Sequence, residues 1–334
     1  MYPAVELTSS EAAGDGAEAR IRASVIVPAR NAAETIERVL AALEQQTSAG
    51  RYDVIVVDDG SDDRTGEIAD AFDGDLDVRV LWQRPSGAAA ARNAGAAASR
   101  ADALVFTDSD CYATAHWLEE GLSGLLDADL VQGCVTPDPQ AELGPWDRTL
   151  WVERETGLFE TANLFVRREV FDLVGGFESW IDPSAGSPMG EDVWFGWRAK
   201  RAGATSAYRP EALVHHAVFP RGPLGFLGER RRLAYFPAMA AKMPELRRQF
   251  FTARLFLSRR SAAFDAALAG ASIAALARSP WPLVVAAPYA RILVGVAWPY
   301  RRRAPVVGAI GLLGDAISLV SLAMGSVRAR TLVL

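Results

Sequence analysis

The first hundred residues alternate between two patterns of apolar positions. Short, continuous apolar runs rich in β-branched residues are typical of buried strands, and they cover residues 21–28, 52–57, 78–81 and 103–107. The segments between them show apolar residues at helical spacing, and they cover residues 31–46, 61–72 and 87–99. In the first of these helices, Ile36, Val39, Leu40 and Leu43 fall on one face. Strands that are apolar throughout and alternate with helices predict an α/β fold with a mostly parallel sheet covered on both faces.

Residues 111–220 follow a less regular pattern. Three apolar runs read as strands, over 130–135, 163–166 and 213–218. A helix is predicted over 191–201, directly after a loop rich in glycine, serine and proline at 182–190. The sheet is therefore expected to continue beyond residue 111.

The last third of the chain has two further patterns. Residues 221–260 are strongly basic, and apolar residues interleave with the arginines in LRRQFFTARLFLSRR. That pattern is typical of a helix on an anionic membrane surface, or of a solvated helix packed on the preceding domain. Farther on, 281–298 and 305–324 are each nearly long enough to span roughly 30 Å of hydrocarbon.

Charged residues argue against two clean membrane spans in this region. Arg291 interrupts the first apolar window and Asp315 the second. If the two formed a spanning hairpin below a cytosolic domain, the arginines at 301–303 would lie outside, against the positive-inside tendency. An interfacial or re-entrant helical hairpin is therefore favoured, and a water-soluble helical appendage that holds a homodimer stays open.

Length and composition turn these patterns into a domain layout. The 334 residues exceed one typical core, so we expect one large domain with an appendage. The polar, acidic residues 1–20 have no apolar h-region and predict a disordered leader. The predicted layout is a domain over 21–220, with halves 21–111 and 112–220, then basic amphipathic helices over 221–260 and an apolar helical region over 261–334, membrane-associated or dimerising.

The net charge and the number of cysteines limit which partners and which cellular compartment are expected. The net charge of −6 gives no reason to expect nucleic acid as a partner. Cys111 and Cys134 form neither a disulfide framework nor a zinc spacing, which fits a reducing compartment. With the apolar C-terminal region, this predicts the cytoplasmic face of the cell membrane, with the cytoplasm as the alternative.

Polar residues gather where the predicted parallel strands end. The three clusters are Pro28-Ala29-Arg30, Asp58-Asp59-Gly60 and Asp108-Ser109-Asp110. In a parallel sheet ligands bind beyond the carboxyl ends of the strands, so these clusters are expected to converge on one crevice. Two carboxylates at the end of a buried strand repel each other unless a cation lies between them. Asp108 and Asp110 therefore predict a Mg²⁺ or Mn²⁺ site that also holds a diphosphate, although a solvated aspartate turn would explain the triplet alone.

Five segments, in this order and spacing, resemble the family 2 glycosyltransferases, which have the GT-A fold, a Rossmann-like sheet flanked by helices. They are SVIVPARNAAETIERVLAALEQQ (24–46), VIVVDDGSDDRTGEIA (54–69), GAAAARNAGAAASRADALVFTDSDC (87–111), NLFVRREVFDLVGGFES (163–179) and GEDVWFGWRAKRAG (190–203). The resemblance covers roughly residues 24–220. It implies an inverting, metal-dependent hexosyltransferase-type enzyme that uses a nucleotide-diphospho-sugar, and the DxD motif is its metal-binding signature.

The resemblance implies roles for the residues at the strand ends. Pro28, Ala29 and Arg30 would line the base and ribose pocket, and Asp58 or Asp59 would accept from the nucleobase. Gly87 and Arg92 would lie over the nucleotide, with Arg92 near the diphosphate. Asp108 and Ser109 would contact the nucleotide sugar, Asp108 also near the metal. Asp110 and His216 would bind the metal, with His215 in reserve; the donor would be a UDP-, dTDP- or GDP-sugar.

The Glu191-Asp192 pair is the candidate catalytic motif. In the family the aspartate of this pair is the general base, which the resemblance assigns here to Asp192. An acceptor hydroxyl must lose its proton as it attacks the anomeric carbon, and a carboxylate within reach supplies that, typically worth about 10²–10⁴-fold. A preference of acidic residues for helix N-termini would explain one of the two carboxylates without any catalysis.

The acceptor is less readable. Trp180 and Trp194 could stack on a glycan, although a tryptophan is more often part of a core. The membrane-facing features favour a lipid-linked or cell-envelope glycan. Two other classes stay open: a sugar-nucleotide nucleotidyltransferase, whose glycine-rich loop after the first strand is missing, and a non-catalytic, membrane-tethered nucleotide-sugar-binding subunit. A dinucleotide oxidoreductase is excluded because G-x-G-x-x-G does not follow the first strand.

Overall fold

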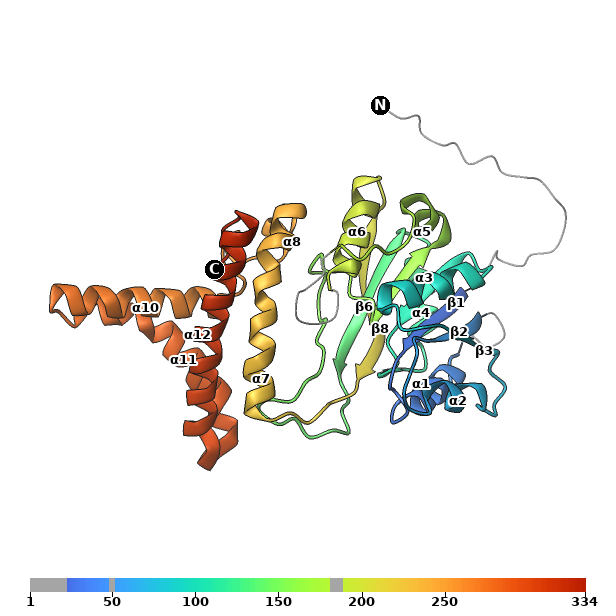
Figure 1. The fold of residues 1–334 in the computed structure, drawn as a ribbon, viewed down its shortest axis with the longest axis horizontal. Coiled ribbons are helices and arrows are strands. Elements are labelled where there is room, and N and C mark those ends of the chain that lie inside the picture. The colour runs from blue at the N-terminus through green and yellow to red at the C-terminus, as the bar shows by residue number, and fades with distance from the viewer. Residues whose placement is uncertain (1–22, 48–51, 181–188) are drawn as a thin grey trace.

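The computed structural model describes residues 23–47, 52–180 and 189–334, so the predicted leader and most of the 182–190 loop lie outside the described residues. Within these residues one sheet of eight strands has the order β3-β2-β1-β4-β7-β6-β8-β5. The strand bounds are β1 Ala23–Ala29, β2 Tyr52–Asp58, β3 Val78–Trp82, β4 Ala103–Thr107, β5 Cys111–Ala113, β6 Leu130–Pro137, β7 Asn163–Arg167 and β8 Ser206–His216. Helices flank this sheet, and the C-terminal helices stand beside it (Figure 1).

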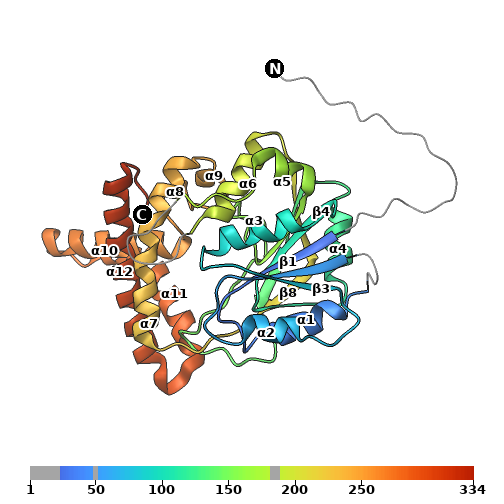
Figure 2. The same cartoon turned by 45° about the vertical axis from the view of Figure 1, so that its right-hand side comes forward.

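The first half of the sheet is parallel, as predicted. Strand β1 pairs with β2 on one side and β4 on the other, so that Val25 lies between Val54 and Val105. Helices α1 (Ile36–Glu44) and α2 (Thr65–Asp70) cover one face, and α3 (Ala88–Ala98) covers the other (Figure 2). The strands are buried on both faces, which explains why they read as continuous apolar runs.

Helices α1 and α2 are shorter than the predicted 31–46 and 61–72. The four apolar residues predicted for one face of α1, Ile36, Val39, Leu40 and Leu43, are all buried. The residues before α1 turn toward the strand ends instead of extending the helix: the Ala32 amide donates to Thr65 Oγ1 (2.7 Å), and the Thr35 hydroxyl donates to the Ser109 carbonyl (2.7 Å). These bonds tie the start of α1 to the edge where the polar clusters lie.

The second half of the sheet is mixed in direction. Strand β7 runs antiparallel to both β4 and β6, and β5 runs antiparallel to β8, whereas β6 and β8 are parallel. Strand β8 begins seven residues before the predicted 213–218 run. The sequence patterns did not predict β5, α4 (Trp117–Gly124) or α5 (Arg168–Val174), while α6 (Glu191–Arg201) has the predicted bounds.

The C-terminal helices form a second region. Their bounds are α7 Pro223–Glu229, η1 Arg230–Tyr235, α8 Phe236–Lys242, α9 Leu246–Gln249, α10 Arg259–Ala277, η2 Trp281–Ala286, α11 Ala287–Ala297, η3 Trp298–Arg303 and α12 Ala304–Ala329. In Figure 1 the helices from α7 to α8 stand between the sheet and α12, and α10 projects away from the sheet. We call residues 221–334 the helical appendage.

An antiparallel hairpin is the core of the appendage. A Cβ on Gly308 would lie 3.9 Å from Ala297 Cβ, and one on Gly311 would lie 3.3 Å from Leu293 Cδ1, so α11 and α12 run in opposite directions. Arg301 has φ 48° and ψ −110°, which breaks the helical path between them. By length and composition, one helical run of the described residues, Trp281–Ala329, could cross a membrane, a test that core helices of soluble proteins also pass.

Asp315, which interrupts the second apolar window of the sequence, is paired inside the appendage. The Arg260 side chain donates from Nε to both Asp315 oxygens, at 2.8 and 3.0 Å, and the Tyr289 hydroxyl donates to Oδ2 at 2.7 Å. These bonds join α10, α11 and α12 at one point. The charge of Asp315 is therefore compensated by the protein itself.

Candidate active site

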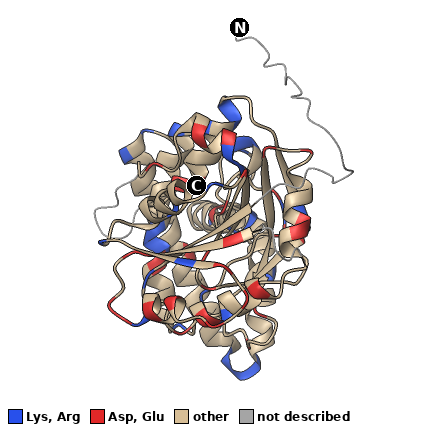
Figure 3. Ribbon diagram, turned by 90° about the vertical axis from the view of Figure 1, so that its right-hand side faces the viewer, with Lys and Arg blue, Asp and Glu red and all other residues tan. Residues whose placement is uncertain are grey.

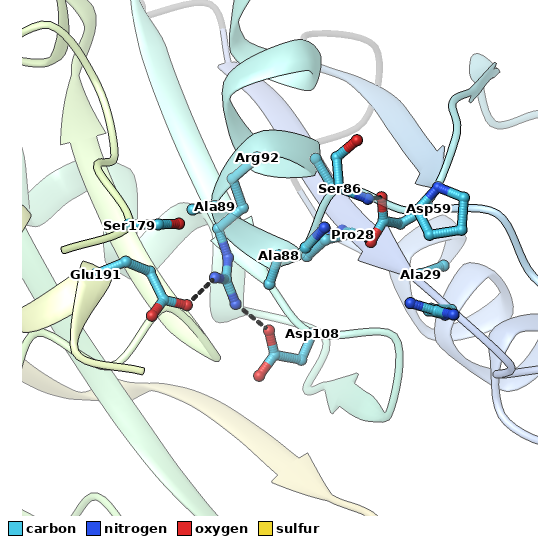
Figure 4. Close-up of a pocket in the computed structure, with 14 residues that line it drawn as sticks. Pro28, Ala29, Asp59, Ser86, Ala88, Ala89, Arg92, Asp108, Ser179 and Glu191 are labelled. Atoms are coloured by element: carbon cyan, nitrogen blue, oxygen red, sulfur yellow. Dashed lines mark hydrogen bonds and ion pairs between the residues drawn. The ribbon is translucent and has the colours of Figure 1, made fainter. Parts of the chain in front are cut away.

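A cavity of about 580 Å³ opens at the carboxyl ends of β1, β2 and β4. It is lined by Pro28, Ala29, Arg30, Asp59, Pro85, Ser86, Gly87, Ala88, Ala89, Ala91, Arg92, Asp108, Ser179 and Glu191 (Figure 4). The three polar clusters of the sequence therefore meet, as their place at the strand ends predicted. Its volume is that of a small-molecule site.

The two neighbouring aspartates at the end of β2 have different surroundings. Asp59 lines the cavity, and its carboxylate accepts from Gln83 Nε2 and the Ser86 amide, each at 2.7 Å, and from the Gly87 amide at 2.8 Å. Asp58 does not line it; its Oδ1 accepts from the Ser61 amide at 2.7 Å and closes the turn. The sequence left open which of the pair faces the ligand, and the geometry points to Asp59.

Asp59 also fixes the glycine before α3. Gly87 has φ 89°, a conformation that side chains rarely adopt, and a Cβ placed there would meet no atom within 4 Å. The open space faces the cavity, where Ser86 and Ala88 are also exposed to a ligand. This is the geometry expected where a backbone must approach a ligand closely.

Arg92 links the two halves of the cavity. Its guanidinium donates to Asp108 Oδ1 at 2.9 Å and to Glu191 Oε1 at 3.3 Å (Figure 4). Burial opposes the charge of Arg92, but the carboxylates of Asp108, Glu191 and Asp192 more than offset it, so the pKa of Arg92 is raised. Its Nε has no partner among the described residues. Arg92 thus holds the end of β4 against the start of α6.

Asp110 and His216 lie together beyond the cavity lining. His216 Nε2 is 3.5 Å from Asp110 Oδ1, because β5 pairs with the end of β8 and brings Cys111 opposite His216. Burial and the neighbouring Asp108 charge raise the pKa of Asp110. One ligand atom each from Asp110, Cys111 and His216 lie within 4.8 Å of one another.

The donor set at this point fits a hard divalent cation. Two carboxylates that repel each other, with an imidazole beside them, suit Mg²⁺ or Mn²⁺, which would relieve the repulsion. Burial raises the pKa of the Cys111 thiol well above its usual range, so it stays protonated and is a poor ligand. His215, the reserve ligand of the sequence, lies instead 3.0 Å from Thr136 Oγ1 through Nδ1.

Asp192 stands in the first turn of α6. Gly190 before the helix has φ 81°, and its carbonyl accepts from Trp180 Nε1 at 2.9 Å. Burial and the adjacent Glu191 charge raise the pKa of Asp192 well above its usual range. A carboxylate with a raised pKa is a stronger base for an acceptor hydroxyl, provided that it is ionised when it acts.

Glu160 is a second buried acid beside α6, and sequence reasoning missed it. Phe159 packs on Gly196, where an added Cβ would lie 2.1 Å from its ring, and Trp197 Nε1 donates to the Gly157 carbonyl at 3.0 Å. Gly196 is one turn from Asp192, so the Glu160 segment runs along that face of the helix. Burial raises the pKa of Glu160 to about 7, and its charge in turn raises the pKa of Asp192.

The remaining predicted residues lie outside the cavity lining. Ser109 contributes its carbonyl to Thr35. Trp180 and Trp194 are half-buried with ring centroids 6.4 Å apart, and Lys242 Nζ lies 4.5 and 4.1 Å from them. Pro85, Ala89 and Ser179 also line the cavity, and no pattern in the sequence singled them out.

Comparisons with known proteins agree with this geometry. Residues 24–179 match the family model of Glycosyl transferase family 2. Glycosyltransferase AglE of Haloferax volcanii is 34% identical over 214 residues, which span 60% of this chain and 68% of that protein. The pre-mycofactocin glycosyltransferase of Mycobacterium tuberculosis is 32% identical over 213 residues, spanning 58% of this chain and 42% of that protein.

A solved structure extends the likeness of the fold. The mannosyltransferase PcManGT of Pyrobaculum calidifontis, solved in complex with GDP-Man and Mn²⁺, superposes with a TM-score of 0.56 at 21% identity. The superposition covers 90% of this chain and 87% of that one, so it includes part of the helical appendage as well as the sheet.

Proposed function

This chain belongs to glycosyl transferase family 2 and is a glycosyltransferase with a GT-A fold, and from that premise we propose that it is an inverting, metal-dependent enzyme. It would move a sugar from a nucleotide-diphospho-sugar to a hydroxyl acceptor. Family membership favours this reaction over the nucleotidyltransferase and the non-catalytic subunit that the sequence left open. The observation that carries the proposal is the Asp108–Arg92–Glu191 bridge, which brings the donor cavity and Asp192 together.

The residues of the cavity would hold the donor. Pro28, Ala29, Arg30 and Asp59 would surround the base and ribose, and Gly87 and Arg92 would face the diphosphate. Asp110 and His216, whose ligand atoms lie within 4.8 Å of each other, would hold a Mg²⁺ or Mn²⁺ with the neighbouring Asp108. The ion would neutralise charge on the leaving nucleoside diphosphate. The Mn²⁺ and GDP-Man in the complex of PcManGT support this metal and donor class.

Asp192 would act as the general base. Its carboxylate would take the proton of the acceptor hydroxyl while that oxygen attacks the anomeric carbon and the bond to the diphosphate oxygen breaks. A single displacement in line with the leaving group inverts the anomeric centre. Glu191 would position this step through its ion pair with Arg92, at 3.3 Å, rather than take the proton itself.

The appendage supports a lipid-linked or cell-envelope acceptor at the cytoplasmic face of the membrane. Large apolar side chains are exposed along it, among them Leu276, Trp281 and Trp298, which are 86%, 82% and 76% exposed. Exposed apolar side chains that gather in one region mark an interaction with a membrane or a partner. The proposed domain layout is the one predicted from the sequence, with the catalytic domain ending near residue 220.

A donor screen with and without metal tests the proposal. We expect one of the UDP-, dTDP- or GDP-sugars, together with Mn²⁺ or Mg²⁺, to raise the melting temperature, because a ligand that binds the native state stabilises it by RT ln(1 + [L]/Kd). Slow release of the nucleoside diphosphate is expected in the same samples and is lost with EDTA. Stabilisation that is unchanged by EDTA would contradict metal dependence, and no stabilisation by any donor would contradict the function.

A further inference from the structure

A second cavity, of about 290 Å³, lies where the appendage meets the catalytic domain. Its lining comes from the residue before Gly190 and from α7, η1 and α8, and comprises Met189, Arg221, Phe226, Glu229, Arg230, Arg232, Leu233 and Phe236. In Figure 1 these helices stand between the sheet and α12. None of these residues belongs to the donor cavity. We call this space the appendage cavity.

The appendage cavity has an excess of positive charge. Three arginines line it against one acid, and Arg221 is paired with that acid, Glu229. Within the described part of the chain Arg230 and Arg232 form no salt bridge, and the Arg230 guanidinium lies over the Phe226 ring at 4.4 Å. Burial, together with the charge of nearby Arg260, lowers the pKa of Arg230. Two guanidinium groups are therefore left to attract an anion.

The position of the cavity connects it with the proposed base. Met189 is followed by Gly190, and Asp192 stands in the first turn of the helix that begins next. A Cβ on Gly190 would lie 3.6 Å from Met239 Cε and 3.7 Å from Trp180 Cζ2, so α8 packs directly on this turn. A molecule that lies in the cavity is therefore next to the turn from which α6 begins.

The walls of the cavity suit an amphiphile. Apolar side chains of Met189, Leu233 and Phe236 share the lining with the arginines. Leu224 on α7, next to the lining, is 83% exposed, and exposed leucines continue along α12 at Leu312 and Leu313. A free sugar or a nucleotide would gain little from these surfaces, whereas an apolar chain attached to a phosphate would use both kinds.

We propose that the appendage cavity binds the phosphate of a lipid-linked acceptor, with Arg230 and Arg232 on the phosphate and the lipid chain along the exposed apolar helices. This inference rests on the proposed function and specifies its acceptor. The guanidinium group of an arginine can donate two parallel, charge-assisted hydrogen bonds to phosphate oxygens. A phosphate held there would leave the acceptor hydroxyl on the side of Asp192.

Binding of farnesyl monophosphate to the full chain in neutral detergent tests the assignment. We expect it to bind at least tenfold more tightly than farnesol, which has no phosphate, and than inorganic phosphate, which has no apolar chain. Titration calorimetry measures the three affinities. Arg230→Gln or Arg232→Gln is expected to weaken this binding about tenfold or more, as the loss of one charge-assisted hydrogen bond implies. Arg231→Gln is the matched control, since Arg231 is exposed and does not line the cavity.

The outcomes separate this inference from its alternatives. Equal losses for Arg230→Gln, Arg232→Gln and Arg231→Gln would overturn it in favour of a diffuse basic surface. Equal affinity for detergent micelles that contain phosphatidylglycerol would overturn it in the same way, and equal affinity for inorganic phosphate would point to a free anion. Arg232 is exposed, so its variant keeps the test valid if Arg230→Gln does not fold. Donor-induced stabilisation in the same preparation, without any binding of farnesyl monophosphate, would reject this inference and leave the proposed function standing.

Discussion

Helices α6 and α10 bury their residues to different extents. The eleven residues of α6 include five that are buried, whereas the nineteen of α10 include only Phe264 and Gly270. The same contrast separates the whole catalytic domain from the appendage: the strands of the first are apolar because protein covers them, and much of the apolar surface of the second is open. Figure 3 shows the charged residues of the molecule mostly on helices and loops, with the strands largely uncharged.

This contrast indicates which apolar surfaces the chain itself covers. Around the sheet, protein atoms cover the apolar side chains of the strands, and Arg92 Nε, which lines the donor cavity, is one of the few buried polar atoms without a partner in the described part of the chain. In the appendage, the polar cluster of Arg260, Tyr289 and Asp315 is satisfied, but the outer apolar side chains are not. Substitutions in the first region are therefore expected to change activity or stability. Substitutions in the second are expected to change its binding to a membrane or a partner.

The largest expected effect is on the chemistry of the catalytic domain. Asp192→Asn keeps the shape of the side chain and removes the base, so we expect transfer to fall about 10²–10⁴-fold. Donor-induced stabilisation should persist, because Asp192 does not line the donor cavity. Rates of nucleoside diphosphate release in the presence of acceptor measure this, with the exposed Asp172→Asn of α5 as the control. Unchanged turnover would contradict the assignment of the base.

The next effect belongs to the appendage. Replacing both Trp281 and Trp298 by serine is expected to weaken binding to vesicles of phosphatidylcholine and phosphatidylglycerol by at least about 100-fold, since burying each large apolar side chain contributes about 1.5–3 kcal/mol. The melting temperature should stay the same, because both rings are exposed. Co-flotation measures the partition. Trp151→Ser, in the catalytic domain and 54% exposed, is the control, and an equal loss with that variant would remove the contrast between the regions.

A third prediction concerns the buried acid beside α6. The pKa of Glu160 is raised from 4.5 to about 7 in the folded protein. Its carboxyl group therefore does not lower the free energy of unfolding below pH 4.5, and it lowers that free energy increasingly as the pH rises to about 7. Glu160→Gln cannot ionise, so its free energy of unfolding does not fall in this way. We therefore expect the variant to be more stable than the parent by up to about 3 kcal/mol at pH 8 and nearly equal at pH 4.5.

Chemical denaturation at the two pH values measures this difference. Glu211→Gln serves as the control, because Glu211 is exposed on β8 and should show no such dependence. Equal stability of the parent and Glu160→Gln at pH 8 would mean that Glu160 has its ordinary pKa in the folded protein. That result would contradict the burial of the Glu160 carboxyl group beside Asp192.

The sequence predicted the parts of the site that follow from local pattern. Asp108 and Asp110 were singled out because they follow an apolar strand, and α6 was predicted because a loop rich in glycine, serine and proline precedes it. The direction of β7 could not be read, since an apolar run looks the same in a parallel and an antiparallel pair. Glu160 carries no pattern of its own: its burial depends on Phe159 packing against Gly196, which is distant in sequence.

Other parts depended on contacts that no local pattern encodes. The division of roles between Asp58 and Asp59 follows from the amides of Ser86 and Gly87, nearly thirty residues away. The appendage was predicted as helical and apolar, and the hairpin of α11 and α12 agrees with that. Its surroundings stayed open because an apolar helix reads the same against protein and against lipid.

A smaller effect is expected from a single methyl group in the catalytic domain. Gly121 lies inside α4, and a Cβ there would be 2.0 Å from Cζ of Phe165, which is fully buried and also packs on Trp117. Gly121→Ala should therefore lower the free energy of unfolding by about 1–3 kcal/mol, the usual range for overpacking, even though alanine favours a helix. Denaturant titration measures it, and a neutral result would show that Phe165 can move aside.

The same substitution in the appendage is expected to have the opposite sign. Gly295 lies inside α11, is exposed, and would place a Cβ with no atom within 4 Å. Gly295→Ala should then stabilise the chain by about 0.5–1 kcal/mol through the lower entropy of its unfolded state. Denaturant titration in dilute solution measures this alongside Gly121→Ala. If Gly295→Ala instead destabilises the protein, and does so more at high protein concentration, a second copy covers this face of α11, and the open surface of the appendage is a dimer interface rather than a surface for lipid.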